Sequence, residues 1–146
     1  MITISIDDRS VLDLLSQLTA RLDDMTPVWN EIGMEIEGRV SARFETERDP
    51  GGQPWTPWSE STRKTYPKAG NGRILDRLGD MLGSLNHQAD ADGVTIGFGV
   101  DYAIYHEYGT KHMPRRGLLM DYPEARRLTP EDEQSILDIL SRYLAP

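Results

Sequence analysis

The sequence predicts an α+β fold in which a small antiparallel sheet packs against a long α-helix, with additional shorter helices that include a C-terminal one. Three patterns predict this fold. Residues 27–47 repeat apolar side chains every three or four positions over four turns, which is the spacing of one helix face. Residues 94–100 alternate strictly between apolar and small or polar side chains, as a half-buried strand does. Thr129 and Pro130, followed by three acidic residues, start a further helix.

The first third of the chain is predicted to be mostly helical. Residues 2–6 alternate isoleucine with hydroxyl side chains, which indicates a short strand, and residues 10–23 carry leucines at helical spacing. Helix 27–47 begins at Thr26-Pro27 and should be the longest of the fold. Gly33 and Gly38 interrupt it at a cost of about 1 kcal/mol each relative to Ala. They indicate either close packing against a neighbour or simply a weak helix.

Residues 48–61 break all periodicity. They contain three prolines, two glycines and two tryptophans, so they form a loop. Either this loop packs down on the domain or it contacts a partner. A short helix is expected from 61 to 66, and the glycine-rich tip at 68–72 leads us to expect a mobile loop over about 48–73.

The second half should contain the sheet. Leucines at helical spacing predict a helix at 74–85, and an Asp-Gly turn predicts a hairpin that pairs 85–89 with 94–100. Residues 102–108 read as about two helical turns closed by Gly109. A further strand is expected around 118–120 and a helix at about 130–144. We expect one domain over 1–146, with a core of about 1–128.

The composition disfavours several classes of protein. The 146 residues include no cysteine and carry a net charge of 16 − 24 = −8, which disfavours a free-standing DNA-binding protein. No apolar run is long enough for a membrane span, and we expect no secretion signal. Charge is uneven: residues 111–127 have a local balance of 5 − 2 = +3 and residues 130–146 one of 1 − 4 = −3. Such separate patches favour head-to-tail contact between copies.

No catalytic, cofactor-binding or metal-binding constellation is predicted. His106-Glu107 is followed by His112 six residues after the first histidine, whereas the zinc-protease motif needs four, and Gly109 would break the helix between them. Gly97-Phe98-Gly99 lacks the third glycine of a dinucleotide-binding loop. No nucleophile elbow and no distinctive carboxylate pair are present. An enzyme is therefore not expected, and neither is a small-molecule substrate.

Two loops are the predicted contact elements. The first carries the two tryptophans, and the second is the basic loop at 111–116. The basic side chains are equally suited to bind phosphate or nucleic acid, to meet an acidic protein surface, or simply to solvate the loop. A protein partner is favoured because the chain is acidic overall and aromatic residues are not interleaved with the basic ones. The predicted interface residues are Trp55, Trp58, Lys111, His112, Arg115 and Arg116.

Four segments between about residues 30 and 120 form an ordered set. They are the long helix ending at Phe44 with DPGGQPW at 49–55, SESTRK at 59–64, ILD with LGDMLGSL at 74–85, and 94–109 with its Gly97, YA, His106 and Tyr108-Gly109. In this order they resemble the phage virion morphogenesis family, the tail-completion proteins of Mu-like tailed phages, and it is the ordered set that is specific. The chain reads Arg115-Arg116-Gly117-Leu118-Leu119 where the family often has an Arg-Pro-Phe-Leu-like segment, and its acidic C-terminal helix has no matched counterpart.

The resemblance implies a small α+β structural protein that acts in tail completion or head–tail joining through protein–protein contacts. Its partners would be other phage tail or neck proteins, and related proteins commonly form rings, often of six, so a homo-oligomer is expected. The location implied is the tail or neck region of a virion or prophage product assembled in the cytoplasm of a bacterial host. The alternative is a ring or neck component that contacts DNA through its basic 111–127 band.

Overall fold

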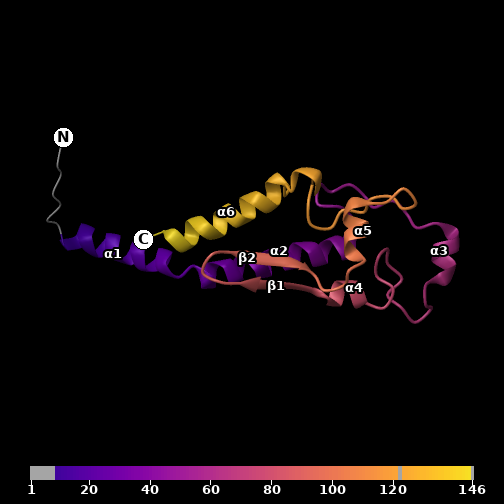
Figure 1. The fold of residues 1–146 in the computed structure, drawn as a ribbon, viewed down its shortest axis with the longest axis horizontal. Helices are drawn as coiled ribbons and strands as arrows, with labels where there is room; N and C mark the ends of the chain where they lie inside the picture. Colours follow the sequence, from indigo (N-terminus) through magenta and orange to yellow (C-terminus); the bar gives the residue numbers. More distant parts are fainter. Residues whose placement is uncertain (1–8, 122, 146) are drawn as a thin grey trace.

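The computed structural model describes residues 9–121 and 123–145, which form an elongated α+β fold (Figure 1). The predicted fold class is confirmed. The predicted strand at 2–6 lies outside the described residues. The elements are α1 (Arg9–Asp23), α2 (Thr26–Thr46), α3 (Glu60–Thr65), α4 (Asp80–Gly83), β1 (Leu85–Ala89), β2 (Val94–Phe98), α5 (Ala103–Tyr108), the 3-10 helix η1 (Pro123–Ala125) and α6 (Pro130–Leu144).

Helix α2 is the centre of the fold, because the sheet and α6 both pack against it. Its apolar face points into the core as the spacing predicted: Ile32, Val40 and Phe44 are at most 1% exposed. Trp29, on the same face, is only partly buried. Val28 and Ile36 of α2 are buried as well, and segments distant from α2 complete the core. The buried hydrophobic residues of those segments are Trp55, Ile74, Met81, Ala103, Leu118 and Ile139.

The sheet is the predicted antiparallel hairpin. Leu85 pairs with Phe98 and Ala89 with Val94, and β2 ends at Phe98, two residues earlier than expected. The carboxylate of Asp90 accepts the backbone N–H groups of Asp92 and Gly93 at 2.8 and 3.1 Å, which fixes the turn. The inward side chains of both strands pack against the core, and the other face of the hairpin lies toward solvent.

Gly33 lets the hairpin approach α2 closely. A Cβ at this position would lie 2.4 Å from Cδ2 of His87, whereas nothing lies within 4 Å of the corresponding position at Gly38. The His87 ring crosses over the glycine, and its two nitrogens lie 2.7 Å from Glu37 Oε1 and 2.8 Å from Asn30 Oδ1. Close packing is thus the explanation for Gly33, and only Gly38 is simply an unfavourable helix residue.

The prediction of a helix at 74–85 is wrong. Only Asp80–Gly83 is helical, because polar contacts hold the preceding residues in an irregular turn. Asp76 is buried and accepts hydrogen bonds from Asn71 and Arg73, while the backbone N–H of Ile74 donates to Glu47. Leu75 consequently adopts a left-handed backbone, with φ of 63°. Leucine spacing alone does not reveal these contacts.

The strand predicted at 118–120 is also wrong. Its backbone N–H groups do not join a ladder but donate to one buried carboxylate, that of Glu107. The apolar character of the segment has a different cause, because Leu118 is 1% exposed and belongs to the core. The short helix around 61–66, the turns at 103–108 and the C-terminal helix are confirmed.

The two terminal helices differ in how they are held. Helix α6 starts at Thr129, whose side chain caps the N–H of Asp132, and it packs along α2. Helix α1 extends beyond the body of the molecule and meets α6 only near the C-terminus (Figure 1). Arg21 donates to the carbonyl of Ala145, and Tyr143 donates to that of Asp24. None of the described helices has the length and apolar character needed to span a membrane.

Candidate protein-binding surface

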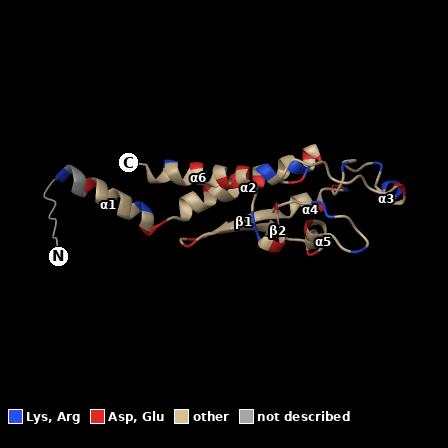
Figure 2. Ribbon diagram, turned by 90° about the horizontal axis from the view of Figure 1, so that it is seen from above, with Lys and Arg blue, Asp and Glu red and all other residues tan. Residues whose placement is uncertain are grey.

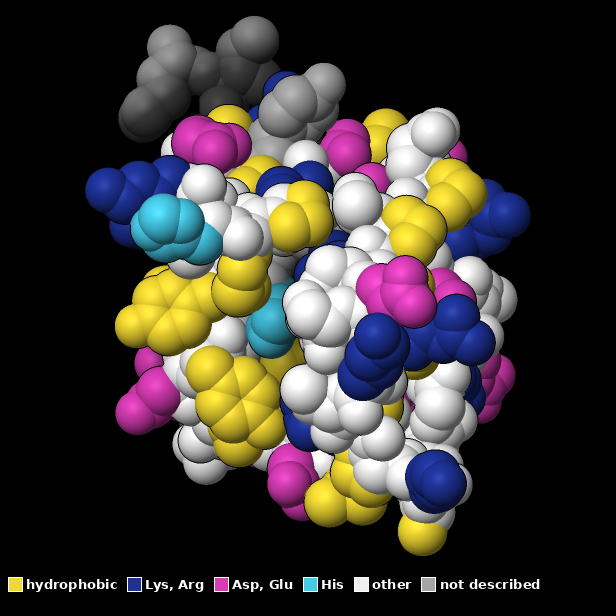
Figure 3. Space-filling view, turned by 90° about the vertical axis from the view of Figure 1, so that its right-hand side faces the viewer, with side chains coloured by type: hydrophobic (Ala, Val, Ile, Leu, Met, Phe, Trp, Pro, Cys, Tyr) yellow, Lys and Arg dark blue, Asp and Glu magenta, His cyan; other side chains and the backbone are white. Residues whose placement is uncertain are grey.

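Helices α3 and α5 and the basic loop at 109–116 gather at the end of the molecule remote from α1 (Figure 1). We call this region the α5 end. It contains every predicted contact residue, and Figure 3 looks directly onto it. Much of this end consists of loops, so the hydrogen bonds that fix these loops determine which of their side chains face solvent.

Glu107 organises the loop that follows α5. Its carboxylate is 5% exposed and accepts the N–H groups of Leu118, Leu119 and Met120 at 2.6, 3.0 and 2.8 Å. Arg115 closes the arrangement, because it donates to the carbonyls of Glu107 and Met120 at 2.7 and 2.5 Å. One buried acid thus binds three consecutive backbone donors, so its charge supports the loop and is not presented to a substrate.

Arg116 joins the basic loop to the tryptophan loop. The Arg116 guanidinium donates to the carbonyls of Thr56 and Pro57 at 2.8 and 3.1 Å, and the backbone N–H of Arg116 donates to the carbonyl of His106. Only 9% of the residue is exposed. Two of the four predicted basic contact residues, Arg115 and Arg116, are therefore largely engaged within the chain, whereas Lys111 and His112 are exposed.

The two tryptophans have different surroundings. Trp55 is 4% exposed, packs edge-on against Phe44 at 5.5 Å and donates from Nε1 to the carbonyl of Gly117 at 3.0 Å. Trp58 is half-buried and packs against Tyr66, with 4.4 Å between ring centroids and 42° between ring planes. Trp55 anchors the loop to the core, so only Trp58 of the pair offers a surface. That the loop meets a partner stays a prediction.

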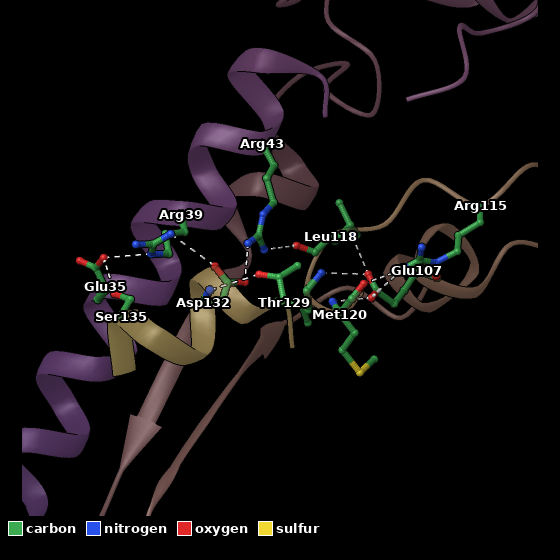
Figure 4. A network of polar contacts seen from close by, with 11 residues as sticks. Glu35, Arg39, Arg43, Glu107, Arg115, Leu118, Met120, Thr129, Asp132 and Ser135 are labelled. Carbon is green, nitrogen blue, oxygen red and sulfur yellow. Dashed lines mark hydrogen bonds and ion pairs between the residues drawn. The ribbon is translucent and has the colours of Figure 1, made fainter. Parts of the chain in front are cut away.

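A second polar network ties α2 to α6 beneath the same loops (Figure 4). Arg43 is 8% exposed and donates to Asp132 at 2.5 Å and to the carbonyl of Leu118 at 2.7 Å. Asp132 is itself 1% exposed. Nearby, hydrogen bonds from Ser135 and then Arg39 lower the pKa of Glu35. Part of the acidic patch expected at 130–146 is therefore buried and paired.

Helix α5 presents an apolar outer face. Within its six residues Ala103 and Glu107 are buried, one turn apart, and His106 is half-buried. The other three side chains and that of Tyr102, which precedes the helix, are 43–55% exposed and lie at helical spacing. They define what we call the α5 face: Tyr102, Ile104, Tyr105 and Tyr108. Exposed aromatic residues gathered in this way are typical of protein interfaces. The sequence indicated packing or interface roles for the tyrosines but did not mark this face.

Hollows lie on both sides of α5. One of about 350 Å³ is bounded by Tyr66, Leu75 and Tyr105, and one of about 520 Å³ lies between the helix and residues 118–120. Figure 3 shows hydrophobic side chains flanking a hollow at this end, with Lys and Arg side chains around it. The α5 face is therefore grooved, and a partner could insert side chains beside the helix.

His106 lies between α5 and the basic loop. Its Nδ1 atom is buried and has no hydrogen-bond partner within the described part of the chain. Burial, and then the charge of Arg116, lower the pKa of His106, so the ring is neutral near pH 7. No group of three or more His, Cys, Asp or Glu side chains suited to a metal ion exists among the residues described.

Charge is distributed along the long axis of the molecule. Exposed acids lie at the α1–α2 connection and in the β1–β2 turn, whereas exposed cations predominate at the α5 end (Figure 2). Within 59–80 and 109–116 there are five exposed cations against two exposed acids, Glu60 and Asp80. The five cations are Arg63, Lys64, Lys68, Arg77 and Lys111. A protein of net charge −8 thus has a locally basic end.

These features define a class of protein: an elongated α+β structural protein whose buried charges hold loops in place and whose distinctive surface is apolar and rimmed by cations. Residues 6–145 match the model of the phage virion morphogenesis family, and the chain belongs to this family. The match confirms the resemblance and extends it over the C-terminal helix. No curated protein and no solved structure matched in the corresponding comparisons. Family membership indicates a structural, virion-associated role in assembly.

Proposed function

We propose that this protein completes the phage tail or joins it to the head, and that it does so by binding other tail or neck proteins through its α5 end. The observation that carries the proposal is the α5 face, where Tyr102, Ile104, Tyr105 and Tyr108 are each at least 43% exposed. Family membership supplies the assembly context. The location in the tail or neck and any ring of copies belong to the same proposal.

The way the end is built supports binding rather than catalysis. Glu107, Arg43 and Asp132 are buried charged residues whose partners are backbone groups and charged side chains of the same chain, so they rigidify the loops behind the surface. A rigid surface binds with a smaller entropic cost than a mobile one. The side chains left to a partner are mainly apolar, with Trp58, Lys111 and His112 at the periphery.

DNA contact through residues 111–127 is the second candidate. Lys111, Arg126 and Arg127 are exposed and favour it, but Arg115 and Arg116 donate to backbone carbonyls and have fewer N–H groups free to bind phosphates. Titration of the protein with duplex DNA at low and physiological salt measures this contribution. Binding that weakens steeply with salt would support a DNA role, and no binding at low salt would exclude it.

Deletion of the gene from the phage or prophage that carries it tests the main proposal. Electron microscopy of the lysate should show heads and tails that are separate, or tails of abnormal length, and infectivity should return when the intact gene is supplied in trans. Normal infectious particles from the deletion strain would contradict the proposed function.

A further inference from the structure

Two hollows adjoin at His106 at the α5 end. The hollow bounded by α3, residues 74–81 and α5 measures about 350 Å³, and a second of about 380 Å³ lies against Trp58 and residues 112–116. The two hollows share five lining residues, so we treat them as neighbouring halves of one surface feature, which we call the His106 groove. The shared residues are Thr62, Tyr66, Leu75, His106 and Met113.

The half nearer α4 is suited to an apolar side chain. Besides the shared residues, its walls include Leu78, Met81 and Tyr105. Leu75 lines both halves and is held with φ of 63°, a conformation that leucine adopts only at an energetic cost. The contacts of Asp76 and Ile74 impose this backbone on its flanks. The fold therefore tolerates backbone strain at Leu75, which is one of the residues that line both halves of the groove.

The other half is suited to an anion. Among the described residues it is lined by His106, His112 and Arg116 and by no Asp or Glu side chain. The half nearer α4, in contrast, includes both Arg77 and Asp80. The exposed cations Arg63 and Lys111 are adjacent in sequence to Thr62 and His112, which line the groove. A carboxylate is therefore electrostatically favoured in the half near Arg116, and disfavoured beside Asp80.

His106 lines both halves of the groove. Its Nδ1 is buried and has no hydrogen-bond partner within the described residues, so a bound segment meets the other edge of the ring. The ring is neutral at pH 7, because burial and Arg116 lower its pKa. A neutral imidazole with its proton on Nε2 can donate to a carboxylate oxygen.

We propose that the His106 groove binds an acidic segment of another virion protein, with an apolar side chain between Leu75 and Met81 and a neighbouring carboxylate beside His106 and Arg116. This inference rests on the proposed function, since it names the partner chemistry of the same end of the molecule. Binding of this type combines an apolar anchor with charge complementarity, and the anchor fixes the register of the segment.

A small probe tests the groove independently of the virion. The purified full-length protein is titrated with 3-phenylpropionate, which joins a ring to a carboxylate, and the methionine methyl groups are followed by NMR. Met81 and Met113 line the groove and should shift with a Kd on the order of 1–10 mM, as expected for a fragment of this size. Met34 is 53% exposed on α2, away from the groove, and should not shift.

Matched variants identify the groups responsible. The neutral 3-phenylpropionamide should bind several-fold more weakly than the carboxylate, and His106→Phe should abolish this preference. Met113→Glu should weaken binding of the carboxylate at least about tenfold, whereas Met34→Glu should leave it unchanged. Equal shifts at Met34 and Met113, equal binding of acid and amide by the native protein, or no shift at all would overturn the inference.

A second measurement separates this inference from the proposed function. Met113→Glu and Met34→Glu are introduced into the phage after each purified variant has been shown to unfold at the native temperature. The inference predicts at least about a tenfold loss of infectious particles for Met113→Glu alone. A normal titre for Met113→Glu would overturn use of the groove, while the role in tail completion would still be decided by the gene deletion.

Discussion

The carboxylate of Glu107 accepts the backbone N–H of Leu118 at 2.6 Å, across a separation of eleven residues. Because the same carboxylate also binds the N–H groups of Leu119 and Met120, it replaces the strand partner that the segment lacks. Glu107→Ala should leave three donors without their acceptor and lower the free energy of unfolding by about 3 kcal/mol. Urea denaturation followed by circular dichroism measures this loss.

Glu124→Ala is the matched control for Glu107→Ala. Glu124 is an exposed glutamate in η1, and its removal should change the free energy of unfolding by no more than about 0.5 kcal/mol. Similar values for the two variants would show that Glu107 does not organise the loop.

The two glycines of α2 should respond to alanine in opposite directions. Gly38→Ala places a methyl group in open space and should stabilise the protein by about 0.5–1 kcal/mol through helix propensity. Gly33→Ala places one 2.4 Å from the His87 ring and should destabilise it by about 1–3 kcal/mol. Thermal unfolding of both variants checks the sign, and stabilisation by Gly33→Ala would contradict close packing of the hairpin on α2.

Arg43 and Asp132 should be energetically coupled. Each is at most 8% exposed, and removal of either partner leaves a buried charge, so Arg43→Met and Asp132→Asn should each cost about 3–5 kcal/mol. The double variant should be less destabilised than the sum of the two, with a coupling energy of about 1–3 kcal/mol. Urea unfolding of the four proteins completes the cycle, and strict additivity would rule out the pair as the link between α2 and α6.

His106 should make the fold sensitive to mild acid. Its pKa is lowered from 6.5 in the folded protein, by burial first and by Arg116 second, so the unfolded chain takes up this proton at higher pH. Stability contributed by the neutral ring is complete above about pH 6.5 and declines as pH falls below it. Wild type should therefore lose more stability between pH 7.5 and 5.5 than His106→Gln.

The comparison of the two proteins isolates His106 because other acid-sensitive groups are common to both. Glu35, whose pKa is lowered by Ser135 and Arg39, also loses its stabilising effect as pH falls. That loss cancels in the difference between wild type and variant. An identical decline in both proteins would mean that His106 is not desolvated in the fold.

Periodicity predicted the parts of the fold that packing on α2 determines. Ile32, Val40 and Phe44 repeat on one helix face, and the alternation at 94–98 places inward residues on the core, so both elements could be foreseen. The helix at 74–85 and the strand at 118–120 could not be judged in the same way. Their outcome depends on three acids whose contacts the spacing does not reveal. Asp76 accepts from Asn71 and Arg73, Glu47 accepts from the N–H of Ile74 across 27 residues, and Glu107 accepts from the N–H of Leu118.

The candidate site shows the same division. Trp58, Lys111 and His112, three of the contact residues predicted from the sequence, lie at the α5 end, and their contact with a partner stays a prediction. The sequence did not separate surface residues from residues that support the loops. Trp55 and Arg116 are the same residue types as exposed contact residues, yet they bind the carbonyls of Gly117 and Thr56. The α5 face depends on which side of a six-residue helix is buried, and the burial of Glu107 decides that.

The proposed function requires that the α5 face binds another virion protein. Ile104 is 55% exposed on this face, and Leu137 is 53% exposed on α6, so aspartate at either position alters an equally accessible residue. The decisive measurement is the titre of infectious phage that carry Ile104→Asp or Leu137→Asp, each first shown to fold as the native protein does. Ile104→Asp should lower the titre at least about a hundredfold, as expected for about 3 kcal/mol of lost binding free energy, and Leu137→Asp should change the titre little. Equal titres for the two variants would show that the α5 face does not bind a virion protein.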